Sequence, residues 1–167
     1  ATFGVTDGNP LWEELRDVAL QAGPAFLLNV TLNERRRLTG VFAGQLVDAH
    51  RAGVAHVRRS AMCPVNTLFE VVVTSNSGSP LDQNLYQTVK GMSAAARILK
   101  PGGTLIVASE CREGAPANSS YERLLRESRD ATDLLRRLRQ AHHVIPDQWQ
   151  VQIQAQIQLR ARVLLHS

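Results

Sequence analysis

The sequence predicts an α/β fold in which a mixed, largely parallel sheet is flanked by helices on both faces. Two apolar runs rich in β-branched residues, "FEVVVTSN" (69–76) and "TLIVAS" (104–109), are typical of buried strands. An amphipathic helical segment separates them, and a strand–helix–strand unit of this kind pairs its strands in parallel. The 167 residues are 44% hydrophobic and 20% charged, so we expect one α/β domain spanning 1–167.

The first 60 residues predict a helix, a hairpin and a second helix. Asn9 is suited to cap the first helix and Pro10 to begin it, while Gly23 ends it. The segments 26–32 and 37–44 predict antiparallel strands, and we expect this hairpin to make the sheet mixed. A helix over 46–60 follows.

The rest of the chain predicts alternating helices and strands. Ser79 is suited to cap a helix that begins at Pro80 and runs to about Leu99. "PGG" (101–103) then predicts a turn, 112–120 a flexible loop, and 162–167 a last strand. Together these elements predict a Rossmann-like layered sandwich.

One segment, "WQVQIQAQIQL" (149–159), fits two structures. Its apolar residues alternate with Gln, and that period of two favours a strand. Eleven residues are long for a strand, however, and Gln is a good helix former. The residues alone leave helix and strand open.

Composition excludes several classes of protein. Cys63 and Cys111 fit neither a disulfide framework nor a C-x-x-C metal pattern, so we expect a reducing, cytoplasmic compartment. No apolar run approaches the roughly 20 residues that span a bilayer, and no signal peptide precedes Pro10. The chain begins with Ala1, and we expect an excised domain. The net charge of +4 lies largely between Arg123 and Arg139, among acidic residues, which favours a solvated surface over binding of nucleic acid or membrane.

The candidate site lies at the start of the helix predicted after Ser79. Lys90 is one of two lysines among 19 basic residues, and Gln87 and Tyr86 precede it. We expect this helix to begin at the carboxyl end of a buried strand, where open α/β sheets bind ligands and helix N-termini attract anions. The predicted ligand is a carboxylate or phosphate, bound by Lys90 and Gln87 next to a site loop of Ser75, Asn76, Ser77 and Gly78. The alternative is an ordinary polar helix face in water.

The same stretch carries a resemblance. "VVVTSNSGSPLDQNLYQTVKGMSAAARILKPGGTLIVASEC" (71–111) resembles the C-terminal domain of the nickel-pincer-nucleotide lactate racemase family. "GVTDGNPLWEE", "VFAGQLVDAHRAGV" and the segment from "IPDQWQVQ" to "RARVLLHS" extend the resemblance over the whole chain. The sequence departs from the family at Ser77 and Ser79, where Gly and an aromatic residue are expected.

The resemblance implies a function for the parent protein. Family members interconvert stereoisomers of 2-hydroxy acids such as lactate by hydride transfer to a nickel-pincer nucleotide. Its tethering lysine and histidines belong to an N-terminal domain absent here, so we expect this chain to be inactive alone and to bind neither cofactor nor metal. The expected partners are that N-terminal domain and a small 2-hydroxy acid. Gln87 and Lys90 match residues that hold the substrate carboxylate, with Tyr86 beside them. The resemblance also favours a helix over 147–159.

Two alternatives differ in kind. "ARILKPGGTLIVAS" also resembles Rossmann-like methyltransferases, but the first strand here is followed by "LNERRR", without the glycine-rich loop of that class. The other alternative is a non-catalytic lid or interaction domain.

Overall fold

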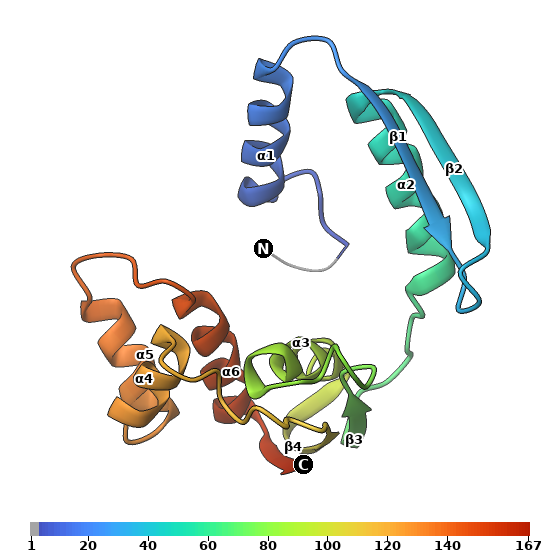
Figure 1. The fold of residues 1–167 in the computed structure, drawn as a ribbon. Coiled ribbons are helices and arrows are strands. Elements are labelled where there is room, and N and C mark those ends of the chain that lie inside the picture. Colours follow the sequence, from blue (N-terminus) through green and yellow to red (C-terminus); the bar gives the residue numbers. More distant parts are fainter. Residues whose placement is uncertain (1–3) are drawn as a thin grey trace. The chain divides into compact units, whose positions relative to one another are not determined.

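The computed structural model describes residues 4–167, and its internal contacts group the chain into two compact units, Ala1–Pro64 and Val65–Ser167 (Figure 1). Each unit is described by itself. A single domain across 1–167 stays a prediction.

The first unit contains the predicted helix, hairpin and helix. These are α1 (Pro10–Gln21), β1 (Phe26–Leu32), β2 (Leu38–Gln45) and α2 (Leu46–Ala61). Asn9 caps α1 as predicted, because its side chain accepts a hydrogen bond from the N–H of Leu11. Strands β1 and β2 pair antiparallel and form a two-stranded sheet of their own. The expectation that the hairpin joins the parallel sheet is therefore wrong: the chain leaves β2 directly into α2, which packs back onto both strands.

The second unit is the parallel part of the fold. It contains β3 (Phe69–Ser75), α3 (Leu85–Ala95), β4 (Leu99–Ala108), α4 (Ser120–Glu127), α5 (Ala131–Gln140), α6 (Gln148–Arg160) and β5 (Arg162–His166). The sheet order is β3-β4-β5, with both pairs parallel. This confirms the α/β class and the largely parallel sheet. Helices α3 and α6 pack on each other and on the sheet, whereas Val71 and Val73 on the other face of β3 are 55% and 69% exposed.

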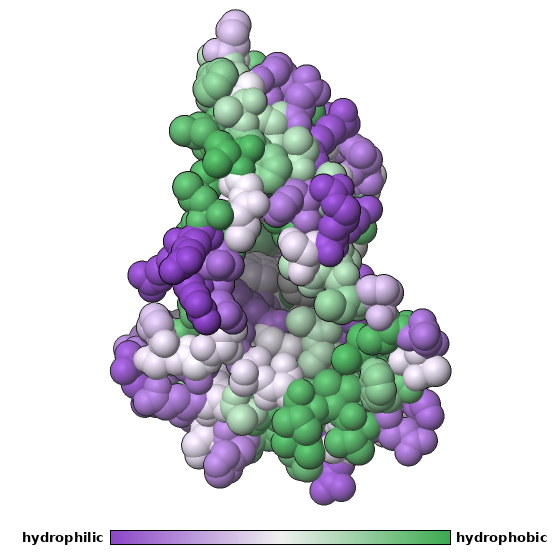
Figure 2. Space-filling view, turned by 90° about the vertical axis from the view of Figure 1, so that its right-hand side faces the viewer, coloured by the Kyte–Doolittle hydropathy of each residue, from purple (hydrophilic) through white to green (hydrophobic). Residues whose placement is uncertain are grey.

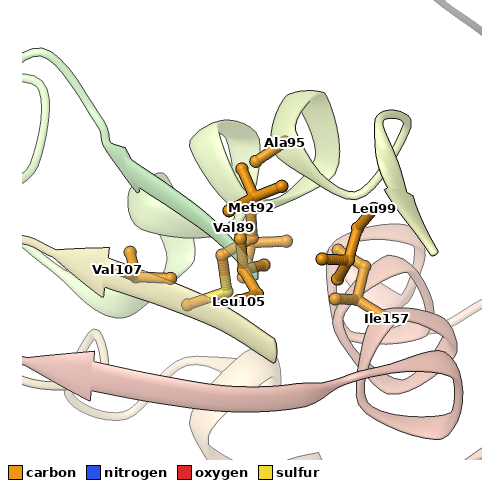
Figure 3. Close-up of a cluster of buried hydrophobic side chains, with 8 residues drawn as sticks. Val89, Met92, Ala95, Leu99, Leu105, Val107 and Ile157 are labelled. Carbon is orange, nitrogen blue, oxygen red and sulfur yellow. The ribbon is translucent and has the colours of Figure 1, made fainter. Parts of the chain in front are cut away.

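The main core lies between the sheet and helices α3 and α6. Figure 3 shows side chains of α3, among them Val89 and Met92, pointing onto β4, with Leu99 beside Ile157. Val89, Leu105 and Val107 have no exposed surface. This packing anchors one face of α3, so its other face is presented in a fixed orientation.

Helix α6 resolves the ambiguous segment, and the helix favoured by the resemblance is confirmed. Alternation with Gln suggests a strand only if every Gln faces solvent. In the structure Gln150 and Gln154 are 1% and 6% exposed. Gln150 donates to the carbonyl of Tyr86, 2.6 Å away, and Gln154 accepts from the hydroxyl of Tyr121. Because both amides have partners, α6 can be buried on a face that the residue pattern marks as polar.

The Pro-Gly-Gly segment lies inside β4, so the predicted turn at 101–103 is wrong. Gly102 has a φ of +80°, and the pairing of β3 with β4 is irregular between Phe69 and Val71. A Cβ on Gly103 would lie 2.7 Å from the carbonyl oxygen of Glu70. The two glycines let the strand continue through a bulge against β3. Within residues 4–167, no helix combines the length and apolar character needed to cross a bilayer.

Candidate functional site

Helix α3 begins at Leu85, so the predicted start at Pro80 is wrong. Asn84 caps it instead, its side chain accepting from the N–H of Gln87 at 3.1 Å. The residues before it are tied to the loop after β4. The N–H groups of Cys111 and Glu113 donate to the carbonyls of Asp82 and Gln83, and the N–H of Leu85 donates to the carbonyl of Gly114.

Because α3 begins at Leu85, the candidate residues lie closer to its N-terminus than predicted. Gln87 lies in the first turn of α3 and Lys90 about one turn further on. The positive end of the helix dipole belongs to this first turn, although the N–H groups of Leu85 and Gln87 are already bonded to Gly114 and Asn84. With the helix beginning at Leu85, its positive end lies close to Gln87 and Lys90. A helix beginning at Pro80 would have placed that end five residues further away.

Gln87 and Lys90 contact each other, which the sequence predicted only as a shared helix face. The Nζ of Lys90 donates to Oε1 of Gln87 at 2.7 Å. Lys90 is exposed and Gln87 half-buried. While its oxygen accepts from Lys90, Gln87 keeps its Nε2 amide as a donor, beside the remaining protons of the ammonium group. These donors suit an anion.

The predicted site loop lies beside this helix. It leaves β3 at Ser75, with Ser77 and Gly78 at positive φ. Asn76 donates through its side-chain amide to the carbonyl of Leu81. Hydrogen bonds from Asn76 to Leu81, from Ser77 to Ser75 and from Leu81 to Gly78 make the loop a compact turn.

Gly91 brings the loop and helix together, and sequence reasoning missed it. A Cβ at Gly91 would lie 2.4 Å from the carbonyl oxygen of Ser75 and 3.4 Å from Oδ1 of Asn76. The turn of α3 that carries Lys90 thus packs against the end of β3, which only a residue without a side chain permits. The signal available in the sequence was a glycine within a strong helical pattern.

Tyr86 contacts the start of α6 and the helix α4. Its hydroxyl donates to Oδ1 of Asp147 at 3.1 Å, and its ring packs edge-on against Tyr121 and Trp149. Burial and then the Asp147 carboxylate raise the pKa of Tyr86. The hydroxyl is neutral and already donating, so Tyr86 fastens α3 to the start of α6 and supports the pair from one side.

A buried polar network lies beneath the first turn of α3. The hydroxyls of Thr88 and Ser109 are 2.6 Å apart, and Thr88 also donates to the carbonyl of Asn84. Cys111 is half-buried, with its thiol 3.3 Å from both hydroxyls. The network joins the ends of α3 and β4, so it fixes the first turn relative to the sheet. Among residues 4–167, no three His, Cys, Asp or Glu gather into a metal-binding group.

Comparison with known proteins gives the family. The family model described as the lactate racemase C-terminal domain matches residues 65–167, which is more than half of the chain. This chain belongs to the lactate racemase family. The match begins within one residue of the boundary between the two units. The resemblance noted in the sequence is thereby confirmed.

Individual members of the family match nearly the whole chain. The lactate racemase of Thermoanaerobacterium thermosaccharolyticum is 38% identical in an alignment 168 positions long, which covers 99% of this chain and 39% of the relative. The lactate racemase of Lactiplantibacillus plantarum is 35% identical, over 95% of this chain and 38% of the relative. The structure of the lactate racemase apoprotein from T. thermosaccharolyticum matches with a TM-score of 0.90 and 35% identity, over 97% of this chain and 39% of that one. The chain therefore spans about two-fifths of the length of these lactate racemases.

Proposed function

We propose that this chain is the substrate-carboxylate-binding half of a nickel-dependent racemase or epimerase of lactate or a related 2-hydroxy acid. The observation that carries the proposal is the contact between Lys90 and Gln87 at the start of α3, in a chain of the lactate racemase family. The family match favours this function over the methyltransferase alternative.

The chemistry needs a grip on the carboxylate. Racemisation by hydride transfer breaks the C–H bond on the carbon next to the carboxylate and remakes it on the opposite face. The carboxylate must therefore stay bound while that carbon is planar. Lys90 supplies a compact positive charge and Gln87 a neutral donor, and together they can bind the two carboxylate oxygens. Holding the acid in one orientation lowers the barrier to reaction, since less freedom is lost in the transition state.

The nickel-pincer nucleotide belongs to the proposed parent. When bound, it would accept and return the hydride. The described residues of this chain offer it no group of metal ligands, and we assign its tether and ligands to the N-terminal domain of the parent.

The compartment is part of the same proposal. Both cysteines are free, Cys63 exposed and Cys111 half-buried. Free thiols of this kind persist in a reducing compartment, so we place the parent protein in the cytoplasm. Its partners in catalysis would be the N-terminal domain and the small acid, without nucleic acid or membrane.

The test is substitution in the intact parent enzyme. Lys90→Ala removes a charge-assisted hydrogen bond, which contributes roughly 1.5–3 kcal/mol, and should lower kcat/KM by about one to two powers of ten. Gln87→Ala should lower it less, because a neutral donor is lost. The substrate amide, which lacks the negative charge, should inhibit the Lys90→Ala variant about as well as the parental enzyme, whereas inhibition by a non-reacting carboxylate should weaken.

Lys100→Ala is the matched control. Lys100 is the other lysine, and it pairs with Glu70 near the opposite end of the sheet at 3.0 Å. Both variants should keep the parental circular dichroism. If Lys90→Ala turns over lactate and related acids as fast as Lys100→Ala, the carboxylate grip is wrong and Lys90 is an ordinary surface charge.

A further inference from the structure

The first unit has almost no core of its own. Among residues 4–64, Ala49 alone is buried. The second unit, by contrast, has two buried clusters, one around Leu105 and one around Tyr121. A unit of about 60 residues is only marginally stable even with a normal core, because it buries a small share of its surface. The first unit therefore needs apolar partners that its own described residues do not supply.

The missing contacts map to one face of the hairpin. Cross-strand pairing places Leu28 opposite Ala43 and Val30 opposite Val41. Side chains alternate between the faces of a strand, so one set shares the face that α2 leaves uncovered. This set, the hairpin face, consists of Phe26, Leu28, Val30, Leu32, Leu38 and Val41, with exposed fractions of 75%, 67%, 41%, 53%, 64% and 58%.

The opposite face of the hairpin is occupied. It carries Leu27, Thr31 and Phe42, all half-buried, and helix α2 packs on both strands. Phe42 lies against the ring of His56 of α2, with ring centroids 5.4 Å apart. The hairpin is thus covered by a helix on one face only. Its other face carries six exposed apolar side chains.

Bare apolar surface of this kind marks a docking site. A two-stranded hairpin is marginally stable in water unless its hydrophobic faces are packed, and contiguous apolar patches are rare on independent proteins. Figure 2 shows hydrophobic residues gathered on the surface of the first unit, in its upper part.

The comparisons point to what covers the hairpin face. The C-terminal domain model begins at residue 65, so the whole first unit lies outside it. The full lactate racemase nonetheless aligns with 99% of this chain, and more than half of that relative lies beyond the alignment. The first unit is therefore part of the family's common structure without being part of its C-terminal domain.

We propose that the hairpin face is the docking surface for the preceding domain of the parent racemase, whose apolar side chains complete the core of the first unit. This inference rests on the proposed function, which supplies that domain. A preceding domain in the same chain meets the hairpin face as an intramolecular contact, at an effective concentration set by the connecting segment. A second copy of this chain has no such advantage.

The experiment measures how accessible the hairpin face is. Leu28→Cys and Val41→Cys are made in the intact parent and in the 167-residue chain, and each protein is labelled with a maleimide under native conditions. Peptide mass spectrometry reports the labelling rate at each site and separates it from the native Cys63 and Cys111. Val144→Cys, at a position 79% exposed between α5 and α6, is the matched control. Circular dichroism checks that each variant folds, and turnover adds a second check for the variants of the intact parent.

Covering by the preceding domain predicts at least about tenfold slower labelling of both hairpin cysteines in the parent than in the chain alone, with Val144→Cys unchanged. Equal, fast labelling in both proteins would overturn the proposal. So would slow labelling in both: a dimeric chain by sedimentation would mean a second copy is the occupant, and a monomeric chain would mean the chain covers its own face. The labelling rate does not depend on catalysis, so a failure of this proposal can be distinguished from a failure of the proposed carboxylate binding by Lys90.

Discussion

Asp133 illustrates how much one side chain can hold together. It lies in the first turn of α5 with 8% of its side chain exposed. Its carboxylate accepts from the guanidinium of Arg136, from the N–H of Arg129 at 3.2 Å, and from Nε of Arg137 at 3.0 Å. Asp130, the cap of the helix, accepts from the N–H of Asp133 in return. These hydrogen bonds, the one from Arg136 first, lower the pKa of Asp133 well below its ordinary value.

This sets a pH dependence. Because the pKa is lower in the folded chain, the unfolded chain takes up the proton first as pH falls. The stabilisation is fully present above the ordinary pKa of 3.8 and is lost as pH falls from there through the folded pKa. Asp133→Asn should therefore lower the midpoint of thermal unfolding at pH 7, and the difference from the parental chain should shrink below pH 3.8.

Glu127→Gln is the control for this measurement, since Glu127 is exposed and forms no ion pair among the described residues. Circular dichroism melts at several pH values give the comparison. Equal midpoints for Asp133→Asn and Glu127→Gln at pH 7 would contradict the role given to Asp133.

For single residues, the sequence predicts Gln87 and Lys90 as a pair because their spacing places them on one helix face, and the structure shows the two side chains in contact. It could not find what Tyr86 does, since the partner of its hydroxyl, Asp147, is 61 residues away in the sequence. Local patterns show which side chains share a face. They do not show which distant group each one meets.

Among the elements, α3 shows both what a pattern predicts and where it fails. Its buried face of Val89 and Met92 follows from the apolar spacing. Its start does not, because Ser79 and Pro80 are good helix-starting residues by local rules, while hydrogen bonds to residues 111–114 keep 82–84 out of the helix. The same holds for Pro-Gly-Gly in β4, where pairing with β3 overrides the tendency to turn. In α6, Gln150 and Gln154 lie on the buried face because their amides bond residues distant in the sequence. Hydrophobic periodicity therefore does not reveal that face.

The close packing of α3 on β3 gives a prediction for this element. Gly91→Ala would place a methyl group 2.4 Å from the carbonyl oxygen of Ser75. The clash is with backbone, which cannot rotate aside as a side chain could, so helix α3 has to shift. We expect a loss of about 1–3 kcal/mol in the free energy of unfolding by urea. In the parent, the same shift moves Lys90, so kcat/KM should fall as well.

Gly53→Ala is the matched control, because a Cβ at Gly53 of α2 would meet the ring of Phe42 at an ordinary 3.4 Å. Alanine is the better helix former, so this change should be neutral or slightly stabilising. Equal unfolding free energies for Gly91→Ala and the parental chain would show that α3 does not need the glycine.

For the molecule as a whole, the α/β class could be predicted because strand and helix periods are local. The division into two units could not, since it depends on which faces find partners in space. The candidate pair lies in the unit with the larger core, and the incomplete unit carries the apolar hairpin face.

The whole chain gives one further prediction. Purified alone, it should neither racemise lactate nor bind nickel stoichiometrically, because we assign the ligands and tether to the parent's N-terminal domain. Chiral chromatography of the acid and elemental analysis of the protein check this. Turnover, or about one nickel per chain, would contradict the assignment; adding the separately expressed N-terminal domain with its cofactor should restore activity.

The loop from Ser75 to Leu81 has a consequence for protein engineering. Its hydrogen bonds from Asn76, Ser77 and Leu81 join residues of the loop to each other, whereas Asn84, Thr88 and Ser109 hold the start of α3. If Lys90 and Gln87 grip the acid group that all 2-hydroxy acids share, the part of the substrate that varies falls to the neighbouring loop. Ser77 and Ser79, where the resemblance leads us to expect Gly and an aromatic residue, are then the positions at which substitution should change substrate range. A library randomised at these two positions, screened against several 2-hydroxy acids, would measure that change.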